Sequence, residues 1–315
     1  MSEAEAIEIA TRHLKPDDDE KTRAGQIAAA IEFTRYVRMD RDSRLMATKW
    51  RGGRIFIPGL NLRRDARQEL FRFGGEQLVK CDIRGCYWWI LCAEIRRALL
   101  LTRATQKIRD QIKTTRVIDN IERLLCIISA GKFYDFLSSK CGIDKDVIKK
   151  RINRLCLFTS GQLRGPEFEV LLAEWPEVVA VINRLRSQLG FTSTASRFLN
   201  GLEGQLMNDP LKSVATAGHT VVRCHDCLAV PPSVVPDAVA AIRFRAEERF
   251  GIVPGIKCEY PDGRVICFGG EIADDFAGQS RSVWKLSPPS PAVVAELADR
   301  VVISVAGVDL NSLVG

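Results

Sequence analysis

Two aspartates occupy similar settings in this chain. Asp82 ends the apolar stretch "LVKCDI", and Asp226 lies in "VVRCHDCLAVP", between two apolar runs. Removing an ionised carboxylate from water is costly unless a cation or hydrogen-bond donors compensate it. Two chemistries would supply the compensation. The carboxylates would share a pair of magnesium ions, as in phosphoryl transfer, or a zinc ion would bind Cys224, His225 and Cys227.

The histidine and cysteine content favours the first chemistry. The chain has three histidines and ten cysteines, and no second cysteine pair has the spacing of Cys224 and Cys227. A zinc site of the common four-ligand kind needs more ligands at suitable spacing. The remaining cysteines are scattered through apolar segments, which is typical of free thiols in a reducing compartment.

The composition is that of an ordinary globular protein. The chain has 315 residues, of which 46% are hydrophobic and 27% charged. No apolar run approaches the roughly 20 residues of a membrane span, and the acidic N-terminus does not resemble a signal peptide. We therefore expect a cytoplasmic protein with no membrane partner.

The formal net charge is +7, and the cations concentrate before Arg154, in stretches such as "EIRRALLLTRATQKIRDQIKTTR" and "DKDVIKKRINR". Such clustering favours a polyanionic partner, whereas solvated helix faces would explain part of it equally well.

The hydrophobic periodicity predicts how the two aspartates are positioned. Residues 1–50 read as helical, 54–57 as extended, and 77–83 as a strand that ends near Asp82. Residues 86–186 are almost entirely helical, and a further helix ends at Gly218. Two strands with a tight turn at His225 and Asp226 follow, then a helix and another strand. We expect an α+β fold, with helices on one face of a small antiparallel sheet and a large helical insertion.

Three segments, in this order, resemble motifs of template-directed polymerases of the DNA polymerase I type (family A). "LVKCDIRGCYWWIL" resembles motif A, "DVIKKRINRLCLFTSG" is similar to the motif B helix, and "VVRCHDCLAVP" is similar to the His-Asp hairpin of motif C. The segment "RIFIPGLNLRRDARQELFRFGGEQ" resembles the lead-in to motif A. The resemblance covers about residues 51–260.

Three positions depart from the family pattern. Cys227 replaces the acid that usually follows His-Asp, Thr159 replaces a glycine, and Asp146 stands where an arginine is expected. Single-subunit phage RNA polymerases share the His-Asp hairpin without the third acid, so the first departure is compatible with activity.

The resemblance implies a role for each matching residue. Asp82, Asp226 and the carbonyl of Ile83 would ligate two Mg²⁺ or Mn²⁺ ions, with His225 near the primer terminus. The incoming nucleoside triphosphate would contact Arg67, Lys150 and Phe158. Tyr87 stands where family A normally has a glutamate; family B polymerases and reverse transcriptases carry a tyrosine or phenylalanine there as a steric gate against the ribose 2′-hydroxyl, so Tyr87 points to deoxynucleotides. Nucleic-acid contacts would come from Arg54, Asn61, Lys149, Arg151, Arg154, Asn200 and Glu203.

The implied architecture is that of a right-hand polymerase. Residues 1–50 would be a helical region and reduced thumb, 51–100 and 199–262 the two parts of the palm, 101–198 a fingers-like insertion, and 263–315 an appended element. The implied function is a minimal DNA polymerase that extends a primer for a plasmid, phage or other mobile element. The alternatives are a primase or RNA polymerase on this scaffold, a degenerate palm that only binds nucleic acid, and a zinc-binding regulatory module.

Overall fold

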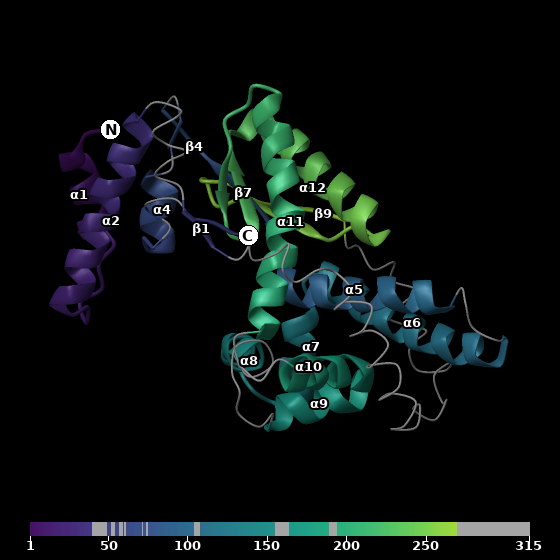
Figure 1. Cartoon of the computed structure of the whole chain (residues 1–315). Helices are drawn as coiled ribbons and strands as arrows, with labels where there is room; N and C mark the ends of the chain where they lie inside the picture. The colour runs from purple at the N-terminus through teal and green to yellow at the C-terminus, as the bar shows by residue number, and fades with distance from the viewer. Residues whose placement is uncertain are drawn as a thin grey trace. The chain divides into compact units, whose positions relative to one another are not determined.

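The computed structural model describes residues 1–39, 49–51, 54–56, 59, 61–70, 72, 73, 75–103, 108–154, 164–188 and 194–269 (Figure 1). They form a mixed α+β protein that divides into two compact units. Unit 1 contains Met1–Asp82, Gly204–Ile242 and Lys257–Ile266. Unit 2 contains Ile83–Glu203, Arg243–Ile256 and the described residues beyond Ile266. Each unit is therefore built from chain segments that are far apart in sequence.

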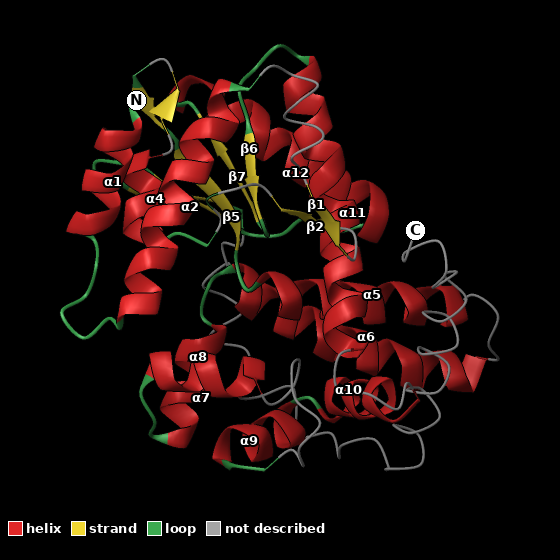
Figure 2. Cartoon of the chain, turned by 60° about the vertical axis from the view of Figure 1, so that its left-hand side comes forward, coloured by secondary structure: helices red, strands yellow, loops and turns green. Residues whose placement is uncertain are grey.

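The main sheet is small and antiparallel, and its five strands follow the order β6-β7-β5-β8-β9. The strands are β5 (Val79–Ile83), β6 (Val222–Cys224), β7 (Cys227–Val230), β8 (Ile256–Glu259) and β9 (Val265–Phe268). Figure 2 shows β5, β6 and β7 as neighbouring yellow strands. Two separate two-stranded sheets pair β1 (Lys49–Arg51) with β2 (Arg54–Phe56), and β3 (Arg72–Phe73) with β4 (Glu76–Gln77).

Residues alternate between the two faces of the main sheet, as the pleat requires. In β5, Val79, Cys81 and Ile83 are buried, whereas Lys80 and Asp82 are only partly buried. The Cys258 Sγ atom in β8 lies 3.4 Å from the Cys81 Sγ atom, so these two thiols share one face. The opposite face therefore carries Lys80 and Asp82, and the alternation in β8 places Lys257 and Glu259 on it as well.

Helices cover both faces of the β6–β7 hairpin. A hydrophobic cluster joins α1 (Glu3–Arg12) and α2 (Glu20–Arg38) to Cys224, Cys227 and Ala229, which the register places on the face of Asp82. On the other face, Arg223 binds Asn208 of α11 (Thr194–Thr216). The prediction of helices on one face only is therefore wrong. The physical reason is that a short hairpin cannot bury its own apolar side chains, so the N-terminal helices bury this apolar surface.

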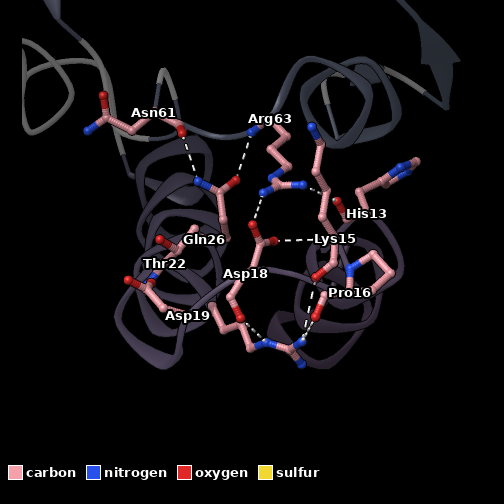
Figure 3. Close-up of polar contacts among 10 residues, drawn as sticks. His13, Lys15, Pro16, Asp18, Asp19, Thr22, Gln26, Asn61 and Arg63 are labelled. Carbon is pink, nitrogen blue, oxygen red and sulfur yellow. Dashed lines mark hydrogen bonds and ion pairs between the residues drawn. The ribbon is translucent and has the colours of Figure 1, made fainter.

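Side-chain hydrogen bonds attach α2 and the loop before it to the segment that leads into α4 (Arg64–Leu70), as Figure 3 shows. The Gln26 side chain donates to the Asn61 carbonyl (3.0 Å) and accepts from the Arg63 backbone N–H (2.8 Å). The Arg63 guanidinium also pairs with Asp18. At the other end of α4, Glu69 binds Arg12 (2.7 Å) and His13 (2.8 Å) at the end of α1.

Unit 2 is helical. Its helices are α5 (Cys86–Arg103), α6 (Ile108–Ser129), α7 (Phe133–Cys141), α8 (Lys145–Asn153), α9 (Pro166–Glu174) and α10 (Pro176–Gln188), with parts of α11 and of α12 (Val235–Phe250). The buried side chains of Trp88, Phe133 and Trp175 lie at its centre, where Phe133 contacts both tryptophan rings. No helix in the described part of the chain is long and apolar enough to cross a membrane.

Candidate active site

The His225–Asp226 dipeptide forms the two-residue turn between β6 and β7. Cys224 and Cys227 are register partners on either side of it, so the predicted tight turn is present. His225 has a φ of +56° and is the only non-glycine residue with positive φ in the described ranges. Two-residue hairpins need positive φ at one or both central positions, and histidine is one of the residue types that tolerates it.

A buried arginine supports this turn. Arg223 is 2% exposed, and its Nε donates to the His225 carbonyl at 2.9 Å. Its guanidinium also donates to the side-chain oxygen of Asn208. The sequence analysis missed this role, although an arginine within the apolar run "VVRC" was a visible signal, because a buried arginine needs several acceptors.

The strand register places Asp82 beside Asp226. β5 runs antiparallel to β7, and Asp82 is the register partner of Cys227, the residue that follows Asp226. The Cα atoms of such register partners lie about 5 Å apart. The two aspartates, 144 positions apart in sequence (226 − 82), are thus brought to the same end of two neighbouring strands. Both are partly buried, so solvent reaches them.

Lys80 is a cation that contacts Asp82. Its Nζ atom lies 3.7 Å from the Asp82 Oδ2 atom. Burial alone would lower the pKa of Lys80, but the negative charges of nearby carboxylates, with Asp82 the largest contributor, outweigh it, so this pKa is raised. Both aspartates therefore lie close enough to Lys80 to stabilise its charged form. The sequence motifs do not mark this residue.

A further carboxylate lies on the same sheet face. Glu259 of β8 is 10% exposed, and its carboxylate pairs with Lys257 at 2.5 Å. The acids on this face are thus accompanied by two lysines.

The four cysteines of the sheet form two thiol pairs on opposite faces. A hydrogen bond with Cys224 and full burial raise the pKa of the Cys227 thiol well above its usual range. Cys224 and Cys227 belong to the hydrophobic cluster with α1 and α2. Within the described residues, no group of three or more His, Cys, Asp or Glu side chains is arranged to hold a metal ion.

The donor set of Asp82 and Asp226 nevertheless suits magnesium or manganese. These hard ions prefer oxygen ligands, and Mg²⁺ is commonly held by one or two carboxylates while water and substrate phosphates complete its coordination. Asp82 is 27% exposed at its side chain, which leaves room for such ligands.

The other candidates of unit 1 differ in accessibility. Arg67 of α4 is partly buried and lies near the hairpin. Its charge acts on Cys224 of the hairpin: a hydrogen bond from Cys227 lowers the pKa of Cys224, and the positive charges of Arg67 and Lys80 lower it further. Asn61 is exposed, and Figure 3 shows that its carbonyl, not its side chain, binds Gln26. Arg54 lies in β2, and its side chain is outside the described residues.

In unit 2, two candidates contact each other. The Tyr87 hydroxyl of α5 donates to the side-chain oxygen of Asn200 in α11 at 2.7 Å. Glu203, one turn further along α11, is fully buried. Ile83 is buried at the end of β5, and Gly85 starts the turn into α5 with a φ of +55°.

The candidate cations of α8 and its C-cap residue Arg154 are all exposed, but two of them also have partners. Lys149 lies 5.7 Å above the Tyr134 ring, and Arg151 pairs at 2.9 Å with the fully buried Glu167 carboxylate. Lys149 and Arg151 therefore have partners within unit 2. Phe158, the predicted stacking aromatic, lies outside the described residues.

Comparisons with protein-family models, with curated proteins and with solved structures found no match to this chain.

Proposed function

We propose that the protein is a template-directed nucleotidyltransferase that extends a nucleic-acid primer, most simply with deoxynucleotides. The observation that carries this proposal is the register of β5 against β7, which brings Asp82 beside the His225–Asp226 turn. The motif order in the sequence and the excess of cations support it. Within this class we favour a minimal DNA polymerase of a plasmid, phage or other mobile element, and a primase or RNA polymerase is the variant with ribonucleotides.

The chain's own residues would divide the work. Asp82 and Asp226 would hold the divalent ions, which when bound neutralise charge on the reacting phosphates. By the motif resemblance, Arg67 and Lys150 are each assigned to the triphosphate, because phosphoryl transfer depends on positioning and charge compensation. Tyr87, held by Asn200, is assigned to selection of the sugar.

The direct test is primer extension by the full chain with Mg²⁺ or Mn²⁺, using deoxynucleotides and ribonucleotides in separate reactions. Asp82→Asn and Asp226→Asn should each lower the rate by at least about 100-fold, since each removes a charged metal ligand. Asp237→Asn is the matched control, because Asp237 is an exposed aspartate of α12 paired with His219. Extension by either site variant at the parental rate would refute the proposal.

A second function has an observation in its favour. Lys80 lies 3.7 Å from Asp82 and supplies a cation from the same strand, which also suits a protein that binds nucleic acid without chemistry. Such a protein would bind a primed template and extend it with neither nucleotide set, so the same assay, run with a binding measurement, separates the two functions.

A further inference from the structure

We propose that Arg223 and Asn208 are positioning residues, which fix the peptide plane between His225 and Asp226 and thereby the direction in which the Asp226 carboxylate leaves the turn. This inference rests on the proposed function for the task of that carboxylate. It adds two residues that the motif resemblance does not include, and it makes the geometry of the turn depend on helix α11.

The first argument is the backbone conformation of the turn. In the described ranges, His225 is the only non-glycine residue with positive φ, so the turn has positive φ at its first central residue alone. This is the pattern of a type II′ turn, which normally has glycine at that position. A side chain makes this conformation less favourable, and such conformations persist where the surrounding structure holds them. The turn therefore needs a contact that holds His225 in place.

The second argument is the hydrogen bond that His225 receives. The Arg223 Nε atom donates to the His225 carbonyl oxygen at 2.9 Å. That carbonyl and the Asp226 nitrogen belong to one planar peptide unit, so a hydrogen bond to the oxygen also restricts the position of the Asp226 Cα atom. On the other side of Asp226, Cys227 pairs with Cys224 and closes the hairpin. The Asp226 backbone is thus held at both of its ends.

The third argument is the fixed position of Arg223 itself. This residue is 2% exposed, and its guanidinium also donates to the Asn208 side-chain oxygen. Asn208 lies in α11 next to Leu206 and Met207, which are fully buried and anchor this part of the helix. A guanidinium is planar and rigid, so two hydrogen bonds define its orientation, whereas a lysine ammonium on its flexible stem is not oriented in this way. Arg223→Lys therefore keeps the charge and loses the orientation.

The test is hydrogen–deuterium exchange of the full chain, read by mass spectrometry on peptides that contain the turn. Arg223→Lys should raise the exchange rate of the turn amides by at least about tenfold, because the turn opens locally more often. Asn208→Leu removes the acceptor on α11, leaves Arg223 in place and should act in the same direction. Ile242→Val is the control, since it shortens a fully buried side chain in another helix of unit 1, and its turn exchange should stay within about twofold of the parent.

Primer extension separates a positioning role from a purely structural one. In Arg223→Lys, kcat should fall at least about tenfold while KM for the nucleotide stays within about twofold, because a displaced Asp226 disturbs the reacting geometry more than nucleotide binding. Ile242→Val should keep the parental kcat. Turn exchange at the parental rate in Arg223→Lys or Asn208→Leu would overturn the inference, and so would a parental kcat in a variant whose turn exchanges faster. A parent that extends no primer would refute the proposed function alone, because the exchange comparison still decides whether Arg223 and Asn208 hold the turn.

Discussion

The hairpin that carries Asp226 depends on Arg223. This buried arginine joins the turn carbonyl to α11, and removing it leaves the His225 carbonyl and the Asn208 side chain without these hydrogen bonds. Arg223→Met should therefore lower the free energy of unfolding by about 2 kcal/mol, measured by urea denaturation. Arg264→Met, which removes an exposed arginine paired with Asp262, should change it by less than about 0.5 kcal/mol. Equal stability of the two variants would show that Arg223 does not support the turn.

Tyr87 has two separable parts, its ring and its hydroxyl. Tyr87→Phe removes the hydrogen bond to Asn200 and should cost about 1 kcal/mol of stability. Asn200→Ala should cost a similar amount, and the two effects should not add, because they remove one shared contact.

If Tyr87 selects the sugar, Tyr87→Gly should raise ribonucleotide incorporation while Tyr87→Phe retains discrimination. Unchanged discrimination in Tyr87→Gly would refute the steric role.

At the scale of elements, strong local patterns were predictable. The strand that ends near Asp82, the tight turn at His225 and the amphipathic helix after it follow from apolar alternation and helical period. The sequence also pointed to Asp82 and Asp226 as neighbours, through their similar positions at strand ends.

Other pairings between distant segments were not predictable. The "GRVICFGG" segment was assigned to an appended element over residues 263–315, yet β9 within it is the edge strand of the main sheet. Its residues are mostly exposed, so no apolar alternation marks it. The sequence likewise gave no sign that Ala6, Ile9 and Ala29 of the N-terminal helices would cover the hairpin face that bears Cys227. The helical periodicity of the sequence also continues from α6 into α7, so it predicts one helix. In the structure Gly131, with a φ of +73°, separates the two helices.

Gly255, directly before β8, tests how tightly unit 2 is packed. A Cβ atom on this residue would lie 2.0 Å from the Ser129 carbonyl oxygen, which is backbone and cannot rotate away. Gly255→Ala should therefore lower the free energy of unfolding by about 3 kcal/mol. Gly25→Ala in α2 meets nothing within 4 Å and should instead stabilise the protein by up to about 1 kcal/mol, because alanine is the better helix former. Thermal or urea unfolding of both variants measures the contrast, and a neutral Gly255→Ala would contradict the packing.

At the scale of the whole molecule, the chain alternates between the two units. Unit 1 takes residues from three separate segments, so no continuous fragment of the chain contains all of it. The acids Asp82 and Asp226 belong to unit 1, whereas Tyr87 and Lys150 belong to unit 2. Functional experiments consequently require the full chain, and the effects of substitutions in one unit are best compared within that unit.

If the protein binds nucleic acid as proposed, its net charge of +7 predicts that the binding depends on salt, and we expect the cations to contribute unequally. On α8, Lys150 is exposed and available for a phosphate, whereas Arg151 already pairs with the buried Glu167. Lys150→Ala should therefore reduce the slope of log affinity against log salt by about one unit, with little change in stability. Arg151→Ala should leave this slope nearly unchanged. It should lower the free energy of unfolding, because the buried Glu167 carboxylate loses the cation that pairs with it. Fluorescence anisotropy with a labelled primed template over a range of salt concentrations measures the slopes. Equal slope changes for the two variants would contradict this expectation, because they would mean that Arg151 gives up its ion pair with Glu167 and contacts a phosphate.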